Sequence, residues 1–251
     1  MSLRMNVVIP MAGRGSRFND YTNKPKPLIE FDSIYRKNDI MLRAVIESLN
    51  IDAQYIFITR GYFDDQYKKE YDKVFQKCCS YYDIVDIDEV TDGAACTALM
   101  SSHLINNDWP VLFVNCDQLM EDWNAEHFLQ NVSQPGSSGG IITFKSDNPG
   151  ASYAKIENGW ICEVAEKELI SDNATAGLYF WKHGKDFVRY AKQMIEKPET
   201  KVNGEYYMCP VYNEALNDGH KFIAYDLNEQ PGTVHLIGTP DELSTYEESL
   251  C

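Results

Sequence analysis

Residues 7–18 read Val-Val-Ile-Pro-Met-Ala-Gly-Arg-Gly-Ser-Arg-Phe, and residues 23–29 read Asn-Lys-Pro-Lys-Pro-Leu-Ile. The apolar start predicts a buried β-strand, and Gly13 and Gly15 predict a tight turn directly after it. Glycine lets backbone N–H groups approach a phosphate closely, and the cationic side chains that follow can neutralise its charge. The spacing fits neither a Walker A motif nor a full dinucleotide fingerprint, because Phe18 stands where the latter has its third glycine. The stretch therefore indicates either an anion-binding turn or a plain strand-to-helix turn beside a solvated basic face.

The placement of charge favours the anion-binding turn. The chain carries a formal net charge of −15. Residues 1–43 nevertheless contain eight Lys and Arg against four Asp and Glu, whereas the rest of the chain contains fifteen against thirty-four. Such an acidic protein is a poor partner for nucleic acid, which needs a basic surface to displace counterions. A small phosphorylated ligand in a locally positive cleft is compatible with this charge distribution.

Length and composition predict one globular domain. The 251 residues are 44% hydrophobic and 12% aromatic, which is enough for one sizeable core. No apolar run approaches the roughly 20 residues needed to span a bilayer, and the N-terminus shows no secretory signal pattern. We therefore expect a soluble, cytoplasmic protein that does not bind membranes. The seven cysteines form no Cys-x-x-Cys pair and are expected to be reduced and mostly buried.

Two motifs near the start of the chain resemble those of a known enzyme family. Ala-Gly-x-Gly-x-Arg-Phe at 12–18 and Pro-Lys-Pro-Leu at 25–28 are together similar to the signature of the sugar-phosphate nucleotidylyltransferases, or nucleoside-diphosphate-sugar pyrophosphorylases, and of their short cytidylyltransferase relatives. The resemblance implies that Arg17 and the turn hold a nucleoside triphosphate, and that Lys26 contacts phosphate at the reacting centre. The turn residues concerned are Ala12, Gly13, Arg14 and Gly15.

Apolar spacing predicts alternating strands and helices over the first half of the chain. Strands are expected at 54–59, 82–87 and 110–114, and helices at 39–50 and 63–78, with another helix opening at Asp92. Asp92 is expected to N-cap that helix. This repeat of strand and helix predicts an α/β fold with a doubly wound, mostly parallel, Rossmann-like sheet covered on both faces.

Two further stretches match the nucleotide-binding side of the family. Gly93 to Thr97 resembles a glycine-and-threonine stretch that borders the nucleotide base, although close helix packing also explains small residues there. Asn115 and Asp117 follow the strand at 110–114, at the edge where ligands bind in open α/β sheets. The resemblance implies that Asp117 is a Mg²⁺ ligand and that Asn115 lies with the nucleotide. A lone aspartate in this place would otherwise usually cap the following turn.

The pattern changes after Gly139 and predicts a smaller antiparallel part. Short strands are expected at 141–145, 152–157, 160–165 and 175–181, after a Ser/Gly/Pro-rich linker at 133–140 and with a hairpin turn at Asn158-Gly159. Helices are expected at 187–195 and 203–216, and a last one after Gly238-Thr239-Pro240. We divide the single domain, 1–251, into a nucleotide-binding half, 5–138, and an acceptor-binding half, 139–251.

Four residues of the second half are implied in acceptor binding by the resemblance alone. Glu166, Lys167 and Gly177 are similar to the family's Glu-Lys and Gly-x-Tyr-x-Phe steps, where acceptor hydroxyls and phosphate are held. Glu205 lies in a segment that resembles one closing over the acceptor in short members. Without the resemblance, a Glu-Lys pair is more often a surface pair.

The resemblance runs along nearly the whole chain. It implies transfer of a nucleotidyl group from an NTP to a sugar phosphate or similar phosphorylated acceptor, with Mg²⁺ as cofactor and release of pyrophosphate. Capsule or surface polysaccharide biosynthesis is the expected pathway class. One position departs from the pattern, because Leu236 stands where larger members have a second metal-binding aspartate. The candidate replacements are Glu205, Asp226 and His235.

Two other function classes stay open. Asp86-Ile87-Asp88 matches the Asp-x-Asp metal motif of nucleotide-sugar glycosyltransferases of similar architecture. A regulator that binds a nucleotide without turnover is the non-enzymatic alternative. The products separate the two enzymes, since a nucleotidylyltransferase releases pyrophosphate and a glycosyltransferase releases a nucleoside diphosphate.

Overall fold

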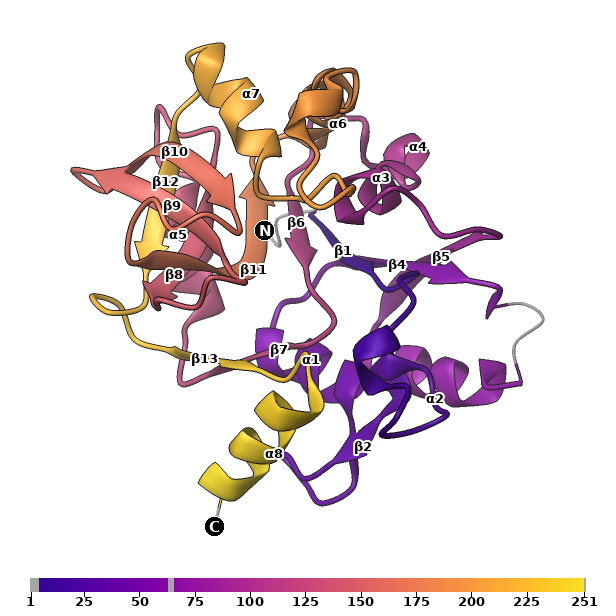
Figure 1. The fold of residues 1–251 in the computed structure, drawn as a ribbon. Helices are drawn as coiled ribbons and strands as arrows, with labels where there is room; N and C mark the ends of the chain where they lie inside the picture. The colour runs from indigo at the N-terminus through magenta and orange to yellow at the C-terminus, as the bar shows by residue number, and fades with distance from the viewer. Residues whose placement is uncertain (1–4, 63–65, 251) are drawn as a thin grey trace.

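A computed structural model describes residues 5–62 and 66–250, and its main feature is a nine-stranded mixed sheet (Figure 1). The strand order is β5-β4-β1-β6-β11-β8-β12-β10-β9. The strands are β1 (Asn6–Pro10), β4 (Gln54–Arg60), β5 (Tyr81–Ile87), β6 (Val111–Val114), β8 (Gly139–Lys145), β9 (Ser152–Glu157), β10 (Trp160–Glu166), β11 (Asn173–Trp181) and β12 (Phe222–Asp226). One continuous sheet therefore includes strands from both predicted halves of the chain.

The sheet is parallel over part of its width. Strands β5, β4, β1 and β6 run parallel to one another, as the alternating pattern predicted. Strand β11 then pairs antiparallel with both β6 and β8, and β9 and β10 form an antiparallel hairpin through the turn at Asn158-Gly159. Strand β12 restores one parallel pairing with β8. The α/β class is confirmed, but the expectation of a mostly parallel, doubly wound sheet is wrong beyond β6, because β11 returns through the middle of the sheet.

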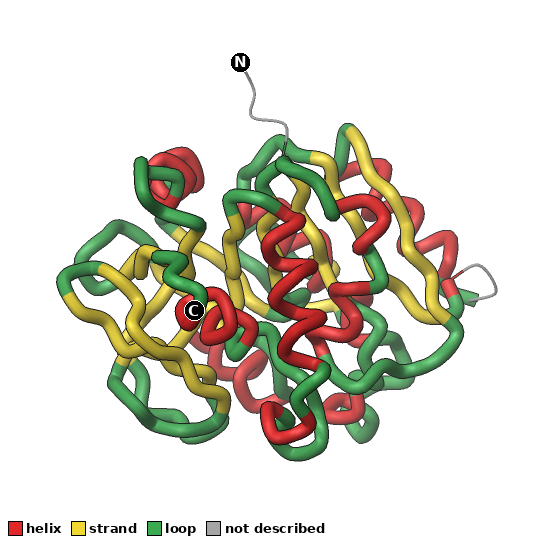
Figure 2. Tube along the Cα trace, turned by 90° about the horizontal axis from the view of Figure 1, so that it is seen from above, coloured by secondary structure: helices red, strands yellow, loops and turns green. Residues whose placement is uncertain are grey.

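Helices cover both faces of the sheet, which Figure 2 shows from above. Two buried clusters lie on opposite faces: one includes side chains of α1, α2 and α5, and the other includes side chains of α3, α6 and α7. Successive residues of β1 alternate between the two clusters and are fully buried, as expected for a strand covered on both sides. The helices are α1 (Met41–Leu49), α2 (Lys68–Cys78), α3 (Ala94–Leu99), α4 (Ser102–Ile105), α5 (Ala125–Val132), α6 (Gly184–Ile195), α7 (Val211–Asn217) and α8 (Pro240–Ser249).

Two small antiparallel sheets lie beside the main one. They pair β2 (Glu30–Phe31) with β3 (Asp39–Ile40), and β7 (Gln118–Glu121) with β13 (Thr233–Leu236). The second pair is important for the site, because it brings the chain near residue 237 alongside the chain that leaves β6. The sequence patterns did not predict β7, β12, β13 or α5.

Two predicted helix starts are wrong. The N-cap of α3 is Gly93 rather than Asp92, whose carboxylate instead pairs with Lys201 at 2.9 Å. The helix expected from 203 begins only at Val211. Asn203 and Gly204 have φ angles of 50° and 84°, which form a tight turn and cannot continue a right-handed helix.

Other expectations can be compared directly with the described residues. The aromatic stripe of α2 is core, with Tyr71, Val74 and Phe75 buried, while Phe63 lies outside the described residues. The six described cysteines are free thiols, but only Cys79 and Cys209 are buried and Cys162 is exposed, so the expectation that most are buried is wrong; Cys251 lies outside the described part. Across 5–62 and 66–250, no helix has the length and apolar character that crossing a membrane requires.

Candidate functional site

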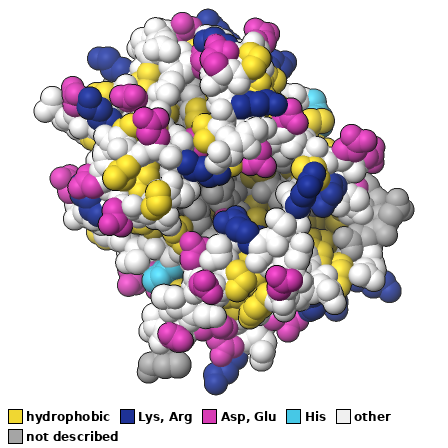
Figure 3. Space-filling model, viewed as in Figure 1, with side chains coloured by type: hydrophobic (Ala, Val, Ile, Leu, Met, Phe, Trp, Pro, Cys, Tyr) yellow, Lys and Arg dark blue, Asp and Glu magenta, His cyan; other side chains and the backbone are white. Residues whose placement is uncertain are grey.

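The candidate site lies at the carboxyl ends of the neighbouring parallel strands β1 and β6 (Figure 1). Residues 11–15, here called the glycine turn, leave β1 at this edge, and Asp117 follows β6. Figure 3 shows that this face is hollowed near its centre and that several Lys and Arg side chains border the hollow. A locally positive hollow in a protein of net charge −15 is where an anionic ligand would be held.

The glycine turn is exposed between two buried anchors. Ala12 and Phe18 are buried at 3% and 1% exposure, whereas Gly13 and Arg14 between them are exposed. Gly15 has a φ of +63°, and a Cβ there would lie 3.3 Å from the Lys26 Cβ. Glycine is therefore required at 15 both for the left-handed backbone and for the approach of Lys26.

Lys26 and Asp117 form an ion pair although they are far apart in the sequence. Lys26 Nζ bonds Asp117 Oδ2 and also donates to the Gly238 carbonyl oxygen at 3.1 Å. The two charged side chains are only 10% and 16% exposed. Arg17, which is 63% exposed, places Nη2 3.8 Å from the same Asp117 oxygen. The structure thus brings together the three residues to which the resemblance gave the phosphates, the reacting centre and the metal.

Residues just before α8 complete this group, and sequence reasoning did not assign them a role. Ile237 N–H donates to the Asp117 carbonyl at 3.0 Å, and Gly238 packs against the Asp117 carboxylate. A Cβ on Gly238 would lie 2.9 Å from Asp117 Oδ2 and 3.3 Å from Glu242 Oε2. The available signal was Thr239 followed three residues later by Glu242, a pattern typical of a helix N-terminus.

The donor set at Asp117 fits Mg²⁺ held largely by substrate. Its carboxylate is partly exposed, and the contacts of Lys26 and Arg17 are both made to Oδ2 rather than to Oδ1. Mg²⁺ is commonly bound by one or two carboxylates together with substrate phosphates and water. Within 5–62 and 66–250, no group of three or more His, Cys, Asp or Glu could hold a metal ion. Any metal here would therefore depend on the nucleotide for most of its ligands.

The proposed replacements for Leu236 make their contacts elsewhere. His235 Nε2 lies 3.1 Å from Glu121 Oε2, and the Asp226 carboxylate accepts from the Asn228 backbone N–H at 3.0 Å. Glu205 is exposed and lies near Tyr207. None of the three has a contact with Asp117 among the described hydrogen bonds and ion pairs.

Cys116, next to Asp117, is not poised as a nucleophile. Burial raises the pKa of its thiol to about 11, and the neighbouring Asp117 charge acts in the same direction. The thiol is therefore neutral at pH 7, and Cys116 packs against the core as a small apolar residue would.

Gly93 and Thr97 are held against a distant segment. Gly93 has a φ of +120°, and a Cβ there would lie 2.5 Å from the Tyr206 carbonyl oxygen. Tyr206 N–H donates to the Asp92 carbonyl at 2.7 Å, and Ala95 N–H donates to the Tyr206 carbonyl at 3.0 Å. The Thr97 hydroxyl donates to the Gly93 carbonyl at 3.1 Å. Close backbone packing thus explains the glycine, and contact with a nucleotide base stays a prediction.

Glu166 and Lys167 lie at the end of β10 with their side chains engaged. Ser152 donates to the Glu166 carboxylate, which is 9% exposed, and burial raises the pKa of this carboxyl group. Lys167, in the left-handed conformation at φ 55°, donates to the Tyr207 hydroxyl at 2.5 Å. Glu205 lies close enough to raise the pKa of Glu166 further. Three of the four predicted acceptor residues are therefore grouped, and Glu166 is no surface residue.

Gly177, the fourth, meets the residues that flank Asp117. It has a φ of +69°, and a Cβ there would overlap Gln118 Oε1 and lie 2.6 Å from Asn115 Nδ2. Asn115 N–H also donates to the Gly177 carbonyl at 3.1 Å. The structure thus places Asn115, predicted on the nucleotide side, against a residue predicted on the acceptor side.

Asp86 and Asp88 show no sign of a metal site. Asp86 Oδ1 accepts from the Thr59 hydroxyl at 2.7 Å and from Tyr62 N–H at 2.9 Å, so it ties β5 to the end of β4. Asp88 is exposed in the turn that follows β5, an edge strand of the sheet. No observation on these two residues favours the glycosyltransferase alternative.

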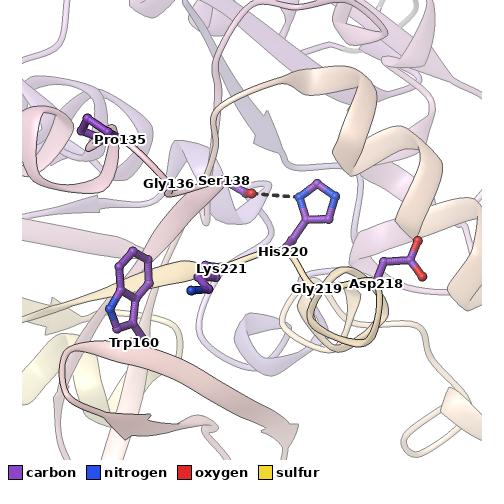
Figure 4. A pocket seen from close by; sticks show the side chains of 8 residues that line it. All are labelled: Pro135, Gly136, Ser138, Trp160, Asp218, Gly219, His220 and Lys221. Atoms are coloured by element: carbon purple, nitrogen blue, oxygen red, sulfur yellow. Dashed lines mark hydrogen bonds between the residues drawn. The ribbon is translucent and has the colours of Figure 1, made fainter.

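A separate cavity of about 530 Å³ lies between the start of β10 and the turn before β12 (Figure 4). Its polar groups are engaged: His220 Nδ1 lies 2.8 Å from Ser138 Oγ, Asp218 pairs with Arg189 at 3.0 Å, and Lys221 lies over the Trp160 ring. None of the candidate site residues lines it.

Comparisons with known proteins identify the fold. No protein-family model and no curated protein matches the sequence. A nucleoside-diphosphate-sugar pyrophosphorylase from Vibrio cholerae superposes with a TM-score of 0.80 at 23% identity, over 96% of this chain and 99% of that one. The inositol-1-phosphate CTP transferase from T. maritima gives 0.74 at 16% identity, over 98% and 95%. A UDP-glucose pyrophosphorylase complexed with UDP-glucose gives 0.73 at 17% identity, over 98% of both chains.

The chain has a nucleotidyltransferase fold. Within this fold, the glycine turn, Lys26 and Asp117 gather at the carboxyl edge of the parallel strands, where ligands bind in open α/β sheets. The antiparallel part contributes Gly177 and the Glu166–Lys167 pair from strands on the other side of β6.

Proposed function

We propose that this protein is a nucleotidylyltransferase that transfers NMP from an NTP to a phosphorylated acceptor, such as a sugar phosphate, and releases pyrophosphate. The observation that carries the proposal is the Lys26–Asp117 pair, with Arg17 3.8 Å from the same carboxylate, at the ligand-binding edge of a nucleotidyltransferase fold. These are the side chains that a reaction between two anions needs at one place.

Charge neutralisation is the main task of such a site. At an effective dielectric near 20, two unit charges about 4 Å apart repel by roughly 4 kcal/mol. Arg17 is exposed and free to reach the outer phosphates, where the N–H groups of the glycine turn would add donors. Lys26 is restrained by Asp117 and by the Gly238 carbonyl, so its ammonium is held in advance for the charge that develops at the α-phosphate.

Asp117 would hold Mg²⁺, which when bound supplies positive charge between the two reactants. The acceptor phosphate is already ionised at neutral pH, so no side chain is required as nucleophile or general base. The Cys116 thiol beside Asp117, which is neutral at pH 7, is consistent with a reaction that uses no side-chain nucleophile.

The acceptor would be held by the residues of the antiparallel part. Lys167 supplies a charge for its phosphate, and the Glu166 carboxylate supplies an acceptor for a hydroxyl donor. Glu166→Ala and Lys167→Ala should therefore raise the acceptor KM several-fold and leave the NTP Kd unchanged. Titration calorimetry with NTP alone and steady-state kinetics test this, and loss of NTP binding in both variants would show that the division near residue 139 is wrong.

A product assay tests the proposed function. The protein is incubated with each of the four NTPs and with sugar-1-phosphates or small alcohol phosphates, in the presence of Mg²⁺, and pyrophosphate is measured. Release that depends on both substrates supports the proposal. Release of nucleoside diphosphate from a nucleotide sugar would support the glycosyltransferase, and tight NTP binding without product for any pair would support the regulator. If the acceptor is a sugar phosphate, the product is a nucleotide sugar, and we therefore include a cytoplasmic role in capsule or surface polysaccharide biosynthesis in the proposal.

A further inference from the structure

A chain of contacts links the C-terminal helix α8 to the ammonium group of Lys26. Glu242, in the first turn of α8, accepts the Gly238 N–H through Oε2 at 2.9 Å. The carbonyl of the same residue, Gly238, accepts from Lys26 Nζ at 3.1 Å. Lys26 in turn bonds Asp117. One carboxylate on α8 therefore fixes the residue whose carbonyl oxygen holds Lys26.

The link is more than a helix cap. The N-cap of α8 is Thr239, whose hydroxyl accepts the Glu242 N–H at 3.2 Å. The Glu242 side chain in turn accepts the N–H of Gly238, the residue before the N-cap. Gly238 has no side chain to hold it, and a Cβ there would press against Asp117 Oδ2 at 2.9 Å. The position of its backbone is therefore set by its own two hydrogen bonds and by the bond from the preceding Ile237 N–H to the Asp117 carbonyl.

We propose that Glu242 is a positioning residue for Lys26, acting through the backbone of Gly238. The proposal rests on the proposed function, in which Lys26 meets the reacting phosphate. The Lys26 ammonium has two hydrogen-bond partners, Asp117 and the Gly238 carbonyl, and it also lies 5.6 Å from the centre of the Phe18 ring. Loss of the Glu242 bond leaves the Gly238 backbone held only through Ile237, whose N–H donates to the Asp117 carbonyl, and through Lys26 itself, so the Gly238 carbonyl holds Lys26 less firmly. Lys26 is then misplaced for the transition state, while the NTP retains its contacts with Arg17 and the glycine turn.

Three variants separate positioning from charge and from helix stability. Glu242→Ala removes the hydrogen bond. Glu242→Gln keeps an oxygen that can accept the Gly238 N–H but removes the negative charge. Tyr246→Phe is the matched control on α8, since it removes a hydroxyl that donates to Glu121 at 2.9 Å and accepts the Ile34 N–H at 3.2 Å, away from Gly238.

The first test is steady-state kinetics of pyrophosphate release, with melting temperature and Mn²⁺ binding to the NTP-analogue complex measured for each variant. Glu242→Ala should lower kcat roughly ten- to hundredfold with little change in the NTP KM, because small misplacements of a catalytic group cost this much. Glu242→Gln should recover most of kcat and bind Mn²⁺ normally. Tyr246→Phe should lower the melting temperature and leave kcat unchanged.

Two results would overturn the proposal. If Glu242→Gln loses kcat and Mn²⁺ affinity as fully as Glu242→Ala, the charge matters and Glu242 is a metal ligand. If Tyr246→Phe lowers kcat as much as Glu242→Ala does, general loosening of α8 explains the effect.

A second readout needs no turnover, so failure of the proposed function stays distinguishable. Lys26 is labelled with a limiting acylating reagent and followed by mass spectrometry. Labelling should rise several-fold in Glu242→Ala and stay at the wild-type level in Glu242→Gln and Tyr246→Phe. Equal labelling of all four proteins would show that Glu242 does not restrain Lys26, whatever reaction the protein catalyses.

Discussion

At the scale of single residues, Lys26 is a lysine whose side chain is largely buried at the candidate site. Its side chain is only 10% exposed, and its ammonium contacts one carboxylate, one carbonyl oxygen and the face of the Phe18 ring. In the proposed reaction, an approaching phosphate would take the place of one of these partners. The same carboxylate, Asp117, is shared with Arg17, which leaves the guanidinium largely in solvent and able to move.

Lys26→Ala should lower kcat about a hundredfold or more and change NTP affinity little, because its interaction is proposed to strengthen in the transition state. Steady-state kinetics and calorimetric NTP binding measure the two quantities. Lys24→Ala is the matched control, since Lys24 is a neighbouring cation that pairs with Glu30 at 2.7 Å outside the site. Near-native turnover of Lys26→Ala would remove Lys26 from the reacting centre.

Glu166 gives a pH-dependent prediction. Burial raises the pKa of its carboxyl group, so the folded protein holds the proton more tightly than the unfolded chain does. The stabilising contribution of the protonated form is complete below the unfolded pKa, about 4.3, and is lost as pH rises through the higher folded pKa. Glu166→Gln, which keeps an acceptor for Ser152, should therefore gain stability over wild type as pH rises from 4 to 8.

Urea unfolding at several pH values tests this, with each protein compared at the same pH. The difference in free energy of unfolding between Glu166→Gln and wild type should grow with pH and then become constant above the folded pKa. A difference that shrinks with rising pH would mean that the ionised carboxylate is stabilised in the folded protein, contrary to the cause assigned here.

At the scale of elements, both the parallel strands and their arrangement could be predicted from the sequence. The antiparallel strands could be predicted one by one, but their pairing could not. The apolar run of β1, the glycine turn and the run of β6 are local patterns, and the rule that parallel strands end at one edge brings Lys26 and Asp117 close. The pairing of β11 with β6 on one side and β8 on the other is set by contacts between distant segments. Periodicity within a strand carries no information about its neighbour.

Short strands and a tight turn were also missed or misassigned in the sequence. Strands β7 and β13 have four residues each, too few for a clear alternation, yet their pairing brings Gly238 to Asp117. Asn203-Gly204 was interpreted as a helix start, although this dipeptide favours a tight turn. Because the β7–β13 pairing was not predicted, Gly238 and Glu242 were not recognised as part of the site.

Strand β11 supplies a prediction at this scale. Gly177→Ala meets two costs, a φ of +69° and overlap with the Gln118 and Asn115 side chains. Gly159→Ala is a matched control, because its φ of +80° imposes a similar backbone cost with nothing within 4 Å of the new Cβ. Gly159→Ala should destabilise by about 1 kcal/mol, and Gly177→Ala by roughly 2–4 kcal/mol. Chemical denaturation measures both changes in the free energy of unfolding. Equal changes would show that the Gln118 and Asn115 side chains can move away from the new Cβ without cost.

At the scale of the whole molecule, the candidate nucleotide-binding and acceptor-binding residues lie on either side of β6. The parallel strands present the glycine turn, and the antiparallel strands present Gly177 and the Glu166–Lys167 pair. The segment 201–208 spans these parts, because Tyr206 bonds the backbone around Gly93 and Tyr207 bonds Lys167. Since Asp117 lies where the parts meet, one carboxylate at β6 is the expected centre of the reaction.

The two function classes place the essential carboxylates at different points of the sheet. Asp117 follows the inner strand β6, whereas Asp86 lies near the end of the edge strand β5 and Asp88 follows it. We expect Asp117→Ala to abolish Mg²⁺-dependent turnover, because no other described residue bonds Lys26 Nζ and offers a carboxylate for the metal. Asp88→Ala should leave kcat/KM within a few-fold of wild type.

Asp86→Ala also tests which carboxylate is essential, because its effect on stability can be measured separately from its effect on turnover. It removes the acceptor for the Thr59 hydroxyl and the Tyr62 N–H, so it should cost about 1–3 kcal/mol of stability. Turnover per folded molecule, measured well below the melting temperature, should nevertheless stay close to wild type. If activity instead follows Asp86 and Asp88 and is indifferent to Asp117, the essential carboxylates lie at β5, and a glycosyltransferase replaces the nucleotidylyltransferase as the function of this fold.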